Sequence, residues 1–297
     1  MSDYILQYRE YLIEKKKMAE NSVSAYVRDV REFSAFIEEK DGKKLDEVSE
    51  ADVASYLLSL KKANKTSSTV NRKLASVRSF YKYMLLSGVL STNPSIEIKT
   101  PKIPRKDIEY LTIEEVETLL SIPDKSTKGL RDVAILELLY ATGLRVSELI
   151  ESNLDDVNLR MGFITCNGDH GKARIIPLGR PAREALETYV YEDRERLLRG
   201  KQDKEKALFL NYYGERITRQ ALWKILKGYA EKSRIDKKIT PQILRNSFAV
   251  HMIQNGADLK SLQELLGHED LAATQIYLSV SKNRIKDVYD RTHPRAK

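Results

Sequence analysis

A short connector rich in proline and basic residues most constrains how this chain can fold. Pro94, Pro101 and Pro104 lie within eleven residues. Each proline removes a backbone donor and pushes the preceding residue toward an extended conformation, so a helix cannot run through this stretch. The parts on either side are each long enough to bury a core. We therefore predict two domains, residues 1–90 and 108–297, joined by a linker at residues 91–107, with the boundary near residue 105.

The residues before the connector carry apolar side chains at helical spacing, which predicts an all-helical domain. Asn21 and Ser22 are expected to cap the second helix, and Gly42 to end it. The predicted helices cover residues 3–18, from about 21 to 41, from 49 or 50 to about 60, and from 67 to 86.

The net charge of +8 is concentrated around the connector. From Lys61 to Arg105 there are ten Lys or Arg and one acid, Glu97, whereas residues 1–50 hold nine basic and twelve acidic residues. This local excess favours a polyanionic partner, although a solvated helix face has a similar composition. Basic residues of the helix at 67–86 that fall mainly off its apolar stripe are expected to reach phosphates or base edges of a duplex. They are Arg72, Lys73, Arg78 and Lys82.

The second domain is predicted to be mostly helical with one β-hairpin. Thr112 and Glu115 form a capping-box pattern, and Gly143 is expected to end an apolar helix, so that Arg145 lies where the chain turns into the next helix. Two β-prone runs flank residues 167–172, which predicts a hairpin with a mobile tip. The runs cover residues 163–166 and 173–177, and further helices are predicted over residues 181–198, 218–233, 244–255 and 259–266.

Several classes of protein are excluded by composition. Cys166 is the single cysteine, which rules out an intramolecular disulfide framework and leaves too few thiolates for a structural zinc site. The histidines lack metal-ligand spacing, so we expect neither a metal nor a cofactor. No leader-like start and no apolar run of about 20 residues is present, so no membrane partner is expected. We expect a cytoplasmic, nucleoid-associated protein.

Four separated residues suggest chemistry on a phosphodiester. His268 follows Gly267, and Tyr277 lies nine residues after the histidine. Arg145 ends the sequence Ala-Thr-Gly-Leu-Arg and Arg245 ends Thr-Pro-Gln-Ile-Leu-Arg. Arginine presents a planar fork of donors that suits the two non-bridging oxygens of a phosphate. Taken singly, each residue also has an ordinary alternative, such as a packed ring or a helix-terminal ion pair.

These sequences occur together with Gly-Ala-Asp-Leu at 256–259, Thr-Gln-Ile-Tyr at 274–277 and Thr-His-Pro-Arg-Ala at 292–296. In this order and spacing they resemble the tyrosine site-specific recombinases of the phage integrase family, specifically the bacterial Xer subgroup, over nearly the whole chain. The resemblance implies a mainly α fold of two domains. An all-helical core-binding domain and an α-rich catalytic domain with a small β-sheet would form a C-shaped clamp on double-stranded DNA.

The resemblance also implies a role for each motif residue. Tyr277 would be the nucleophile that forms a 3′-phosphotyrosine, while Arg145 and Arg245 would clamp the phosphate and stabilise its pentavalent state. His268 would donate a hydrogen bond to a non-bridging oxygen. Glu148, three residues after Arg145 on a predicted helix, could brace that arginine.

Two positions depart from the family pattern. Where relatives have His-x-x-Arg, this chain has Gln242, whose amide can hold a phosphate or orient a water but cannot take a proton near pH 7. Where Xer relatives have Gly-Lys-Gly-x-Lys, Asp169 stands at the first lysine and Lys172 at the second. We expect Lys172 to supply the general acid, with His170 as the alternative. An exposed turn without a catalytic role is also consistent with these hairpin residues.

The resemblance implies metal-independent site-specific recombination by four protomers on synapsed DNA, either all identical or shared with a paralogue. Residues 281–289, within the C-terminal segment, would dock on a neighbouring protomer. The role would be chromosome dimer resolution, which serves chromosome partition and cell division, or DNA integration, excision or inversion. Two other functions fit the same residues: a type IB topoisomerase-like nicking-closing enzyme, and a DNA-binding accessory protein impaired in catalysis by Gln242 and Asp169.

Overall fold

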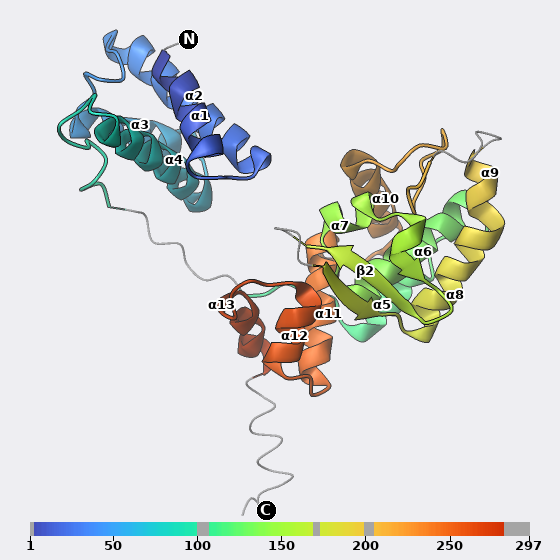
Figure 1. The fold of residues 1–297 in the computed structure, drawn as a ribbon. Helices are drawn as coiled ribbons and strands as arrows, with labels where there is room; N and C mark the ends of the chain where they lie inside the picture. The colour runs from blue at the N-terminus through green and yellow to red at the C-terminus, as the bar shows by residue number, and fades with distance from the viewer. Residues whose placement is uncertain (1–2, 100–106, 169–172, 199–204, 282–297) are drawn as a thin grey trace, which may run out of the picture. The chain divides into compact units, whose positions relative to one another are not determined.

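A computed structural model describes residues 3–99, 107–168, 173–198 and 205–281. The chain divides into two compact units, Met1–Lys106 and Asp107–Lys297 (Figure 1). Helices dominate both units and one small sheet belongs to the second, which confirms the predicted fold class. In the described ranges no helix is long and apolar enough to cross a membrane. Pro101 and Pro104, the hairpin tip with Lys172, and residues 282–297 lie outside the described residues.

The described helices of the first unit are α1 (Asp3–Glu14), α2 (Glu20–Asp41), α3 (Glu50–Lys62) and α4 (Ser67–Leu86). Their apolar stripes meet in one core, in which Tyr8, Phe33 and Phe80 are fully buried. Gly42 ends α2 with a φ of 64°, as predicted. The predicted cap at residues 21–22 is wrong, because α2 already begins at Glu20.

Lys73 of α4 does not face outward. Its side chain is only 5% exposed, because it lies on the face of α4 that packs against α2. There it forms an ion pair with Glu32, and its Nζ lies 3.7 Å from a carboxylate oxygen of the fully buried Asp29. A buried, paired ammonium is not available to DNA. The prediction that Lys73 faces a ligand is therefore wrong.

The other three predicted DNA-binding residues lie nearer the surface. Lys82 is exposed. The side chain of Arg72 is 43% exposed, and its guanidinium is paired with Asp29. Arg78 is half-buried and donates hydrogen bonds to the backbone carbonyls of Ser95 and Ile98, so it holds the residues that follow α4.

The second unit is built around the apolar helix α6 (Thr127–Thr142), which supplies five fully buried apolar residues to the main core of this unit. The other described helical segments before the hairpin are α5 (Ile113–Leu120), α7 (Val146–Glu151) and η1 (Leu154–Asp156). After the hairpin come α8 (Arg180–Thr188), the π-helical segment η3 (Tyr189–Asp193), α9 (Arg194–Leu198), α10 (Arg219–Ser233), α11 (Pro241–Gln254), α12 (Leu259–Leu266), α13 (Ala272–Gln275) and the 3₁₀ segment η4 (Ile276–Ser281).

The sheet is antiparallel, in the order β1 (Val157–Asn158), β2 (Phe163–Asn167) and β3 (Ala173–Pro177). Ile164, Cys166 and Ile176 are buried, and burial of one face fixes the register of the hairpin. The hairpin strands confirm the prediction. The two-residue strand β1 was not predicted, because it is too short to show an alternating pattern.

Gly143 sets the geometry that leads into the site. It ends α6 with a φ of 61°, and a Cβ at this position would lie 2.5 Å from the ring of Phe248 on α11. Only glycine allows both the left-handed conformation and this close approach. The end of α6 therefore abuts α11, and Arg145, as the residue before α7, is held next to α11.

Candidate active site

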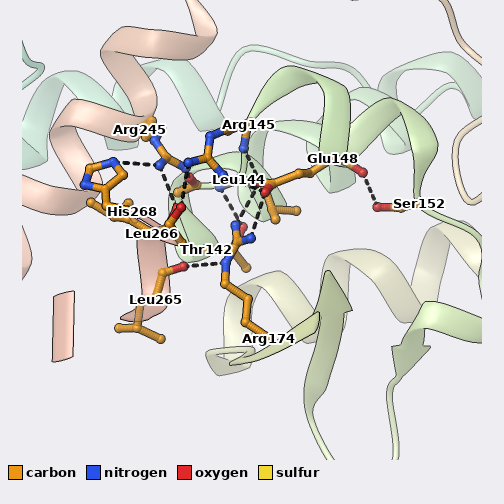
Figure 2. Close-up of polar contacts among 12 residues, drawn as sticks. Thr142, Leu144, Arg145, Glu148, Ser152, Arg174, Arg245, Leu265, Leu266 and His268 are labelled. Atoms are coloured by element: carbon orange, nitrogen blue, oxygen red, sulfur yellow. Dashed lines mark hydrogen bonds and ion pairs between the residues drawn. The ribbon is translucent and has the colours of Figure 1, made fainter. Parts of the chain in front are cut away.

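Glu148 is a buried carboxylate that orients two arginines (Figure 2). Its oxygens accept from the backbone N–H of Arg145 at 2.7 Å and from Arg145 Nη1 at 3.0 Å. Arg174 on β3 donates from Nη1 and Nη2 to the two oxygens, at 2.7 and 2.8 Å. Burial alone would raise the pKa of Glu148, but the hydrogen bonds from Arg174 and Arg145 lower it overall. The carboxylate is therefore charged at neutral pH and braces Arg145, as the three-residue spacing predicted.

Sequence reasoning missed Arg174. Its Nε also donates to the carbonyl of Leu265 at 2.9 Å, so it ties β3 to α12. Gly267, which ends α12 with a φ of 62°, lies directly against this side chain: a Cβ there would be 2.8 Å from Arg174 Nη1. The glycine before His268 is thus required by backbone conformation and by the arginine. An arginine in a short strand gave no sequence signal for this role.

Arg245 lies on α11 and is only 4% exposed. Its guanidinium donates to the carbonyls of Gly143 and, at 2.8 Å, Leu266, while Arg145 Nη2 donates to the carbonyl of Gly267 at 2.7 Å. These carbonyls belong to the C-terminal ends of α6 and α12, where backbone acceptors lack helical partners and the helix dipole is negative. Burial, and then the charge of Arg145, lower the pKa of Arg245 to about 10, so it stays protonated at pH 7.

His268 is neutral in this structure. Burial and the charges of Arg245, Arg145 and Arg174 lower its pKa to about 4. Its Nε2 lies 3.0 Å from Arg245 Nη2, and because a guanidinium can only donate, Nε2 is the acceptor. The proton is therefore on Nδ1, which donates to Thr274 Oγ1 at 2.8 Å. The expected donation from His268 to a phosphate requires the ring to gain a proton on Nε2.

A cavity of about 250 Å³ opens beside the two motif arginines. It is lined by Leu144, Arg145, Val146, Ser147, Arg219, Pro241, Gln242 and Arg245. Three guanidinium groups and one amide offer donors to an anion. Arg219, the exposed first residue of α10, was not singled out from the sequence, because the tertiary fold brings α10 to this cavity.

Tyr277 is 1% exposed and packs with Phe248, Leu262 and Leu266 in a small core between α11, α12 and η4. Its hydroxyl donates to Asn246 Oδ1 at 3.3 Å. Burial raises the pKa of Tyr277, an effect that the charge of Arg245 partly offsets. The structure thus shows the predicted nucleophile protonated, buried and turned to Asn246, a residue that the sequence did not single out.

The base of the hairpin adjoins His268. A second cavity, of about 430 Å³, is lined by Gly168 and Ala173 at the two ends of the hairpin tip, and by His268 and Arg174 among others. Lys172, Asp169 and His170 lie outside the described residues, so the predicted general acid stays a prediction. Over the described ranges, no group of three or more His, Cys, Asp or Glu residues could hold a metal ion.

Comparisons with known proteins agree with this fold and site. The model of the phage integrase family matches residues 109–284, and that of the phage integrase N-terminal SAM-like domain matches residues 5–88. A tyrosine recombinase XerD from Listeria innocua is 46% identical over 298 residues, covering the whole of both chains, and one from Oceanobacillus iheyensis is 43% identical over the same length and coverage. The chain therefore belongs to the phage integrase family. Within that family it is an Xer-like tyrosine recombinase.

Solved structures share the fold at low identity. XerH site-specific recombinase bound to a palindromic difH substrate has a TM-score of 0.76 and 20% identity, with 97% of this chain and 84% of that chain covered. A lambda integrase dimer bound to a COC′ core site has a TM-score of 0.73 and 16% identity, with 93% and 94% covered.

Proposed function

We propose that this protein is a site-specific DNA recombinase that cleaves and rejoins strands through a 3′-phosphotyrosine. The observation that carries the proposal is the convergence of Arg145 and Arg245 on one cavity, with His268 bonded to Arg245 and Tyr277 on a segment packed against the same helix. The full-length likeness to tyrosine recombinases supports it.

In the proposed reaction, a DNA phosphate binds in the cavity between the guanidinium groups of Arg145 and Arg245. The Tyr277 oxygen attacks phosphorus, so that a tyrosine O–P bond forms while the bond to the 5′-oxygen breaks. The arginines stabilise the extra negative charge of the pentavalent state. The phenol proton passes to solvent, because the Gln242 amide cannot take it, and we assign the proton that the departing 5′-oxygen receives to the Lys172 ammonium. Rejoining reverses the steps, because the phosphotyrosine keeps the bond energy.

The proposed partner is double-stranded DNA carrying a recombination site, bound by a homo-tetramer or by a hetero-tetramer with a paralogue, in the cytoplasm at the nucleoid. Solved structures of the same fold are bound to DNA. In this chain we assign phosphate contacts to Lys82 of α4 and Arg219 of α10, because both are exposed, and to Arg72, whose side chain is 43% exposed beside its ion pair with Asp29. Proposed roles are chromosome dimer resolution, or integration, excision or inversion of DNA.

The test is a covalent adduct. A nicked duplex carrying a selected binding site is incubated with the protein, and DNA-linked protein is separated on a denaturing gel. We expect an adduct that Tyr277→Phe abolishes while leaving DNA binding intact. A site that is bound tightly and gives no adduct would contradict the catalytic proposal.

Tight binding of the site without an adduct would favour the DNA-binding accessory protein, for which Gln242 and the buried Tyr277 are the motivating observations. Relaxation of a supercoiled plasmid that lacks the site would instead favour the topoisomerase-like activity.

A further inference from the structure

Asn246 connects two residues of the site that are far apart in sequence. It follows Arg245 on α11 and is half-buried. Its Oδ1 accepts two hydrogen bonds, from Gln242 Nε2 at 2.9 Å and from the Tyr277 hydroxyl at 3.3 Å. Its Nδ2 donates to the backbone carbonyl of Glu109 at 3.0 Å.

The direction of these bonds follows from their chemistry. A backbone carbonyl can only accept, so the atom of Asn246 that faces Glu109 must be the amide nitrogen. The opposite atom, which faces Tyr277, is therefore the oxygen. An amide oxygen can only accept, so the Tyr277 hydroxyl must be the donor and must carry its proton. Gln242, one helical turn earlier, donates to the same oxygen and keeps it in place.

Resting on the proposed role of Tyr277 as the nucleophile, we propose that Asn246, held by Gln242, is a positioning residue that keeps the Tyr277 hydroxyl protonated and buried until the hydroxyl is released for attack. A phenolate in this position would face the partial negative charge of Oδ1 and would lose the hydrogen bond. The contact therefore selects the unreactive form of the tyrosine. Gln242, which cannot take a proton, acts here through Asn246.

The first test measures how accessible Tyr277 is in the full-length protein without DNA. Tetranitromethane nitrates tyrosine as the phenolate, and peptide mass spectrometry gives the rate at Tyr277. We expect Asn246→Ala to raise this rate about fivefold, the factor for loss of one hydrogen bond, and Gln242→Ala to raise it less. The matched control is Asn255→Ala at the C-cap of the same helix, where Asn255 Nδ2 donates to the carbonyl of His251. Unchanged rates in both folded variants would overturn the proposal.

The second test uses the sign of a pKa change. The Tyr277 phenol is followed by ¹³Cζ NMR, with Tyr277→Phe identifying the signal. Asn246→Ala should lower the pKa, because the neutral phenol loses its acceptor. Asn246→Asp should raise it, because the acceptor remains and a carboxylate charge opposes the phenolate. Shifts in the same direction, as expected from mere loosening of the core, would overturn the proposal.

These readouts need no DNA, so they separate this inference from the proposed function. A missing covalent adduct, together with faster nitration in Asn246→Ala, would overturn the recombinase activity. The contact with Asn246 would then still protect Tyr277, but the hydroxyl would have no attack on DNA to be released for. An adduct together with unchanged nitration and pKa would overturn the role of Asn246 alone.

Discussion

Gln242 departs from the His-x-x-Arg pattern of the family that the sequence resembles. Its side chain lines the cavity beside Arg145 and Arg245, and its amide donates to Asn246. Two effects are therefore combined at this residue. It lacks a site for a proton, and it helps to fix the acceptor that holds Tyr277. The two effects can be separated by substitution, because one replacement restores a base and another does not.

We expect Gln242→His to raise the single-turnover rate of strand cleavage by at least about tenfold, since a well-placed general base contributes about 10²–10⁴-fold. The control is Gln242→Leu, which also loses the amide that holds Asn246 but gains no base. Equal rates for the two variants would show that proton acceptance at residue 242 does not limit cleavage.

Glu148 is the second residue whose role can be measured singly. Glu148→Gln removes the charge between Arg174 and Arg145, and leaves Arg174 buried without its carboxylate. We expect a loss of about 3 kcal/mol in the free energy of unfolding. The control is Glu184→Gln, which breaks the exposed pair with Arg180 and should cost under about 1 kcal/mol. Urea denaturation measures both, and a similar loss in both would contradict a special role for Glu148.

The contribution of Glu148 to the free energy of unfolding depends on pH. The pKa of Glu148 is lowered in the folded protein, so the unfolded state binds the proton more readily. The stabilisation is thus present above the unfolded pKa of about 4.3 and is lost as pH falls through the folded pKa. The difference between wild type and Glu148→Gln should shrink in acid.

At the scale of elements, the ends of helices decide where the site residues lie. α6 ends at Gly143 and α12 ends at Gly267, and the carbonyls without helical partners at these ends accept from Arg245 and Arg145. The sequence predicted the end of α6 from Gly143, because a glycine after an apolar helix is a local signal, and it predicted a helix over residues 259–266. The π-helical segment Tyr189–Asp193 was not predicted, and we have no sequence signal that marks it.

Gly267→Ala should destabilise the second unit by about 2–3 kcal/mol, because the new Cβ adds left-handed strain of about 1–2 kcal/mol and displaces the Arg174 side chain. Gly162→Ala is the control: its φ of 73° is also left-handed, but its nearest contact would be an ordinary 3.8 Å. Chemical denaturation of both variants compares the two costs. Equal losses of unfolding free energy in the two variants would show that the contact with Arg174 adds nothing to the cost of left-handed strain.

At the scale of the whole molecule, each unit has a hydrophobic core of its own, one formed by α1–α4 and one around α6. We expect a fragment of residues 107–297 to fold independently, with a cooperative thermal transition and a helical circular dichroism spectrum. The matched fragment, residues 1–106, is measured in the same way and is also expected to fold by itself. A fragment that unfolds without cooperativity would show that the units depend on each other for stability.

Local patterns in the sequence predicted the mainly helical class, most helix ends and the hairpin strands, because apolar spacing and caps depend on residues close together in the chain. The order and spacing of the motifs singled out Arg145, Arg245, His268 and Tyr277. Which side chains of the site contact one another depends on the tertiary fold. Arg145 meets the carbonyl of Gly267 across 122 residues, Arg174 meets that of Leu265 across 91, and Tyr277 meets Asn246 across 31.

Three further properties also came from packing between elements: the burial of Lys73, the proton position on His268 and the burial of Tyr277. Each depends on the side chain that a second element brings opposite, and the spacing within one element carries no information about that partner.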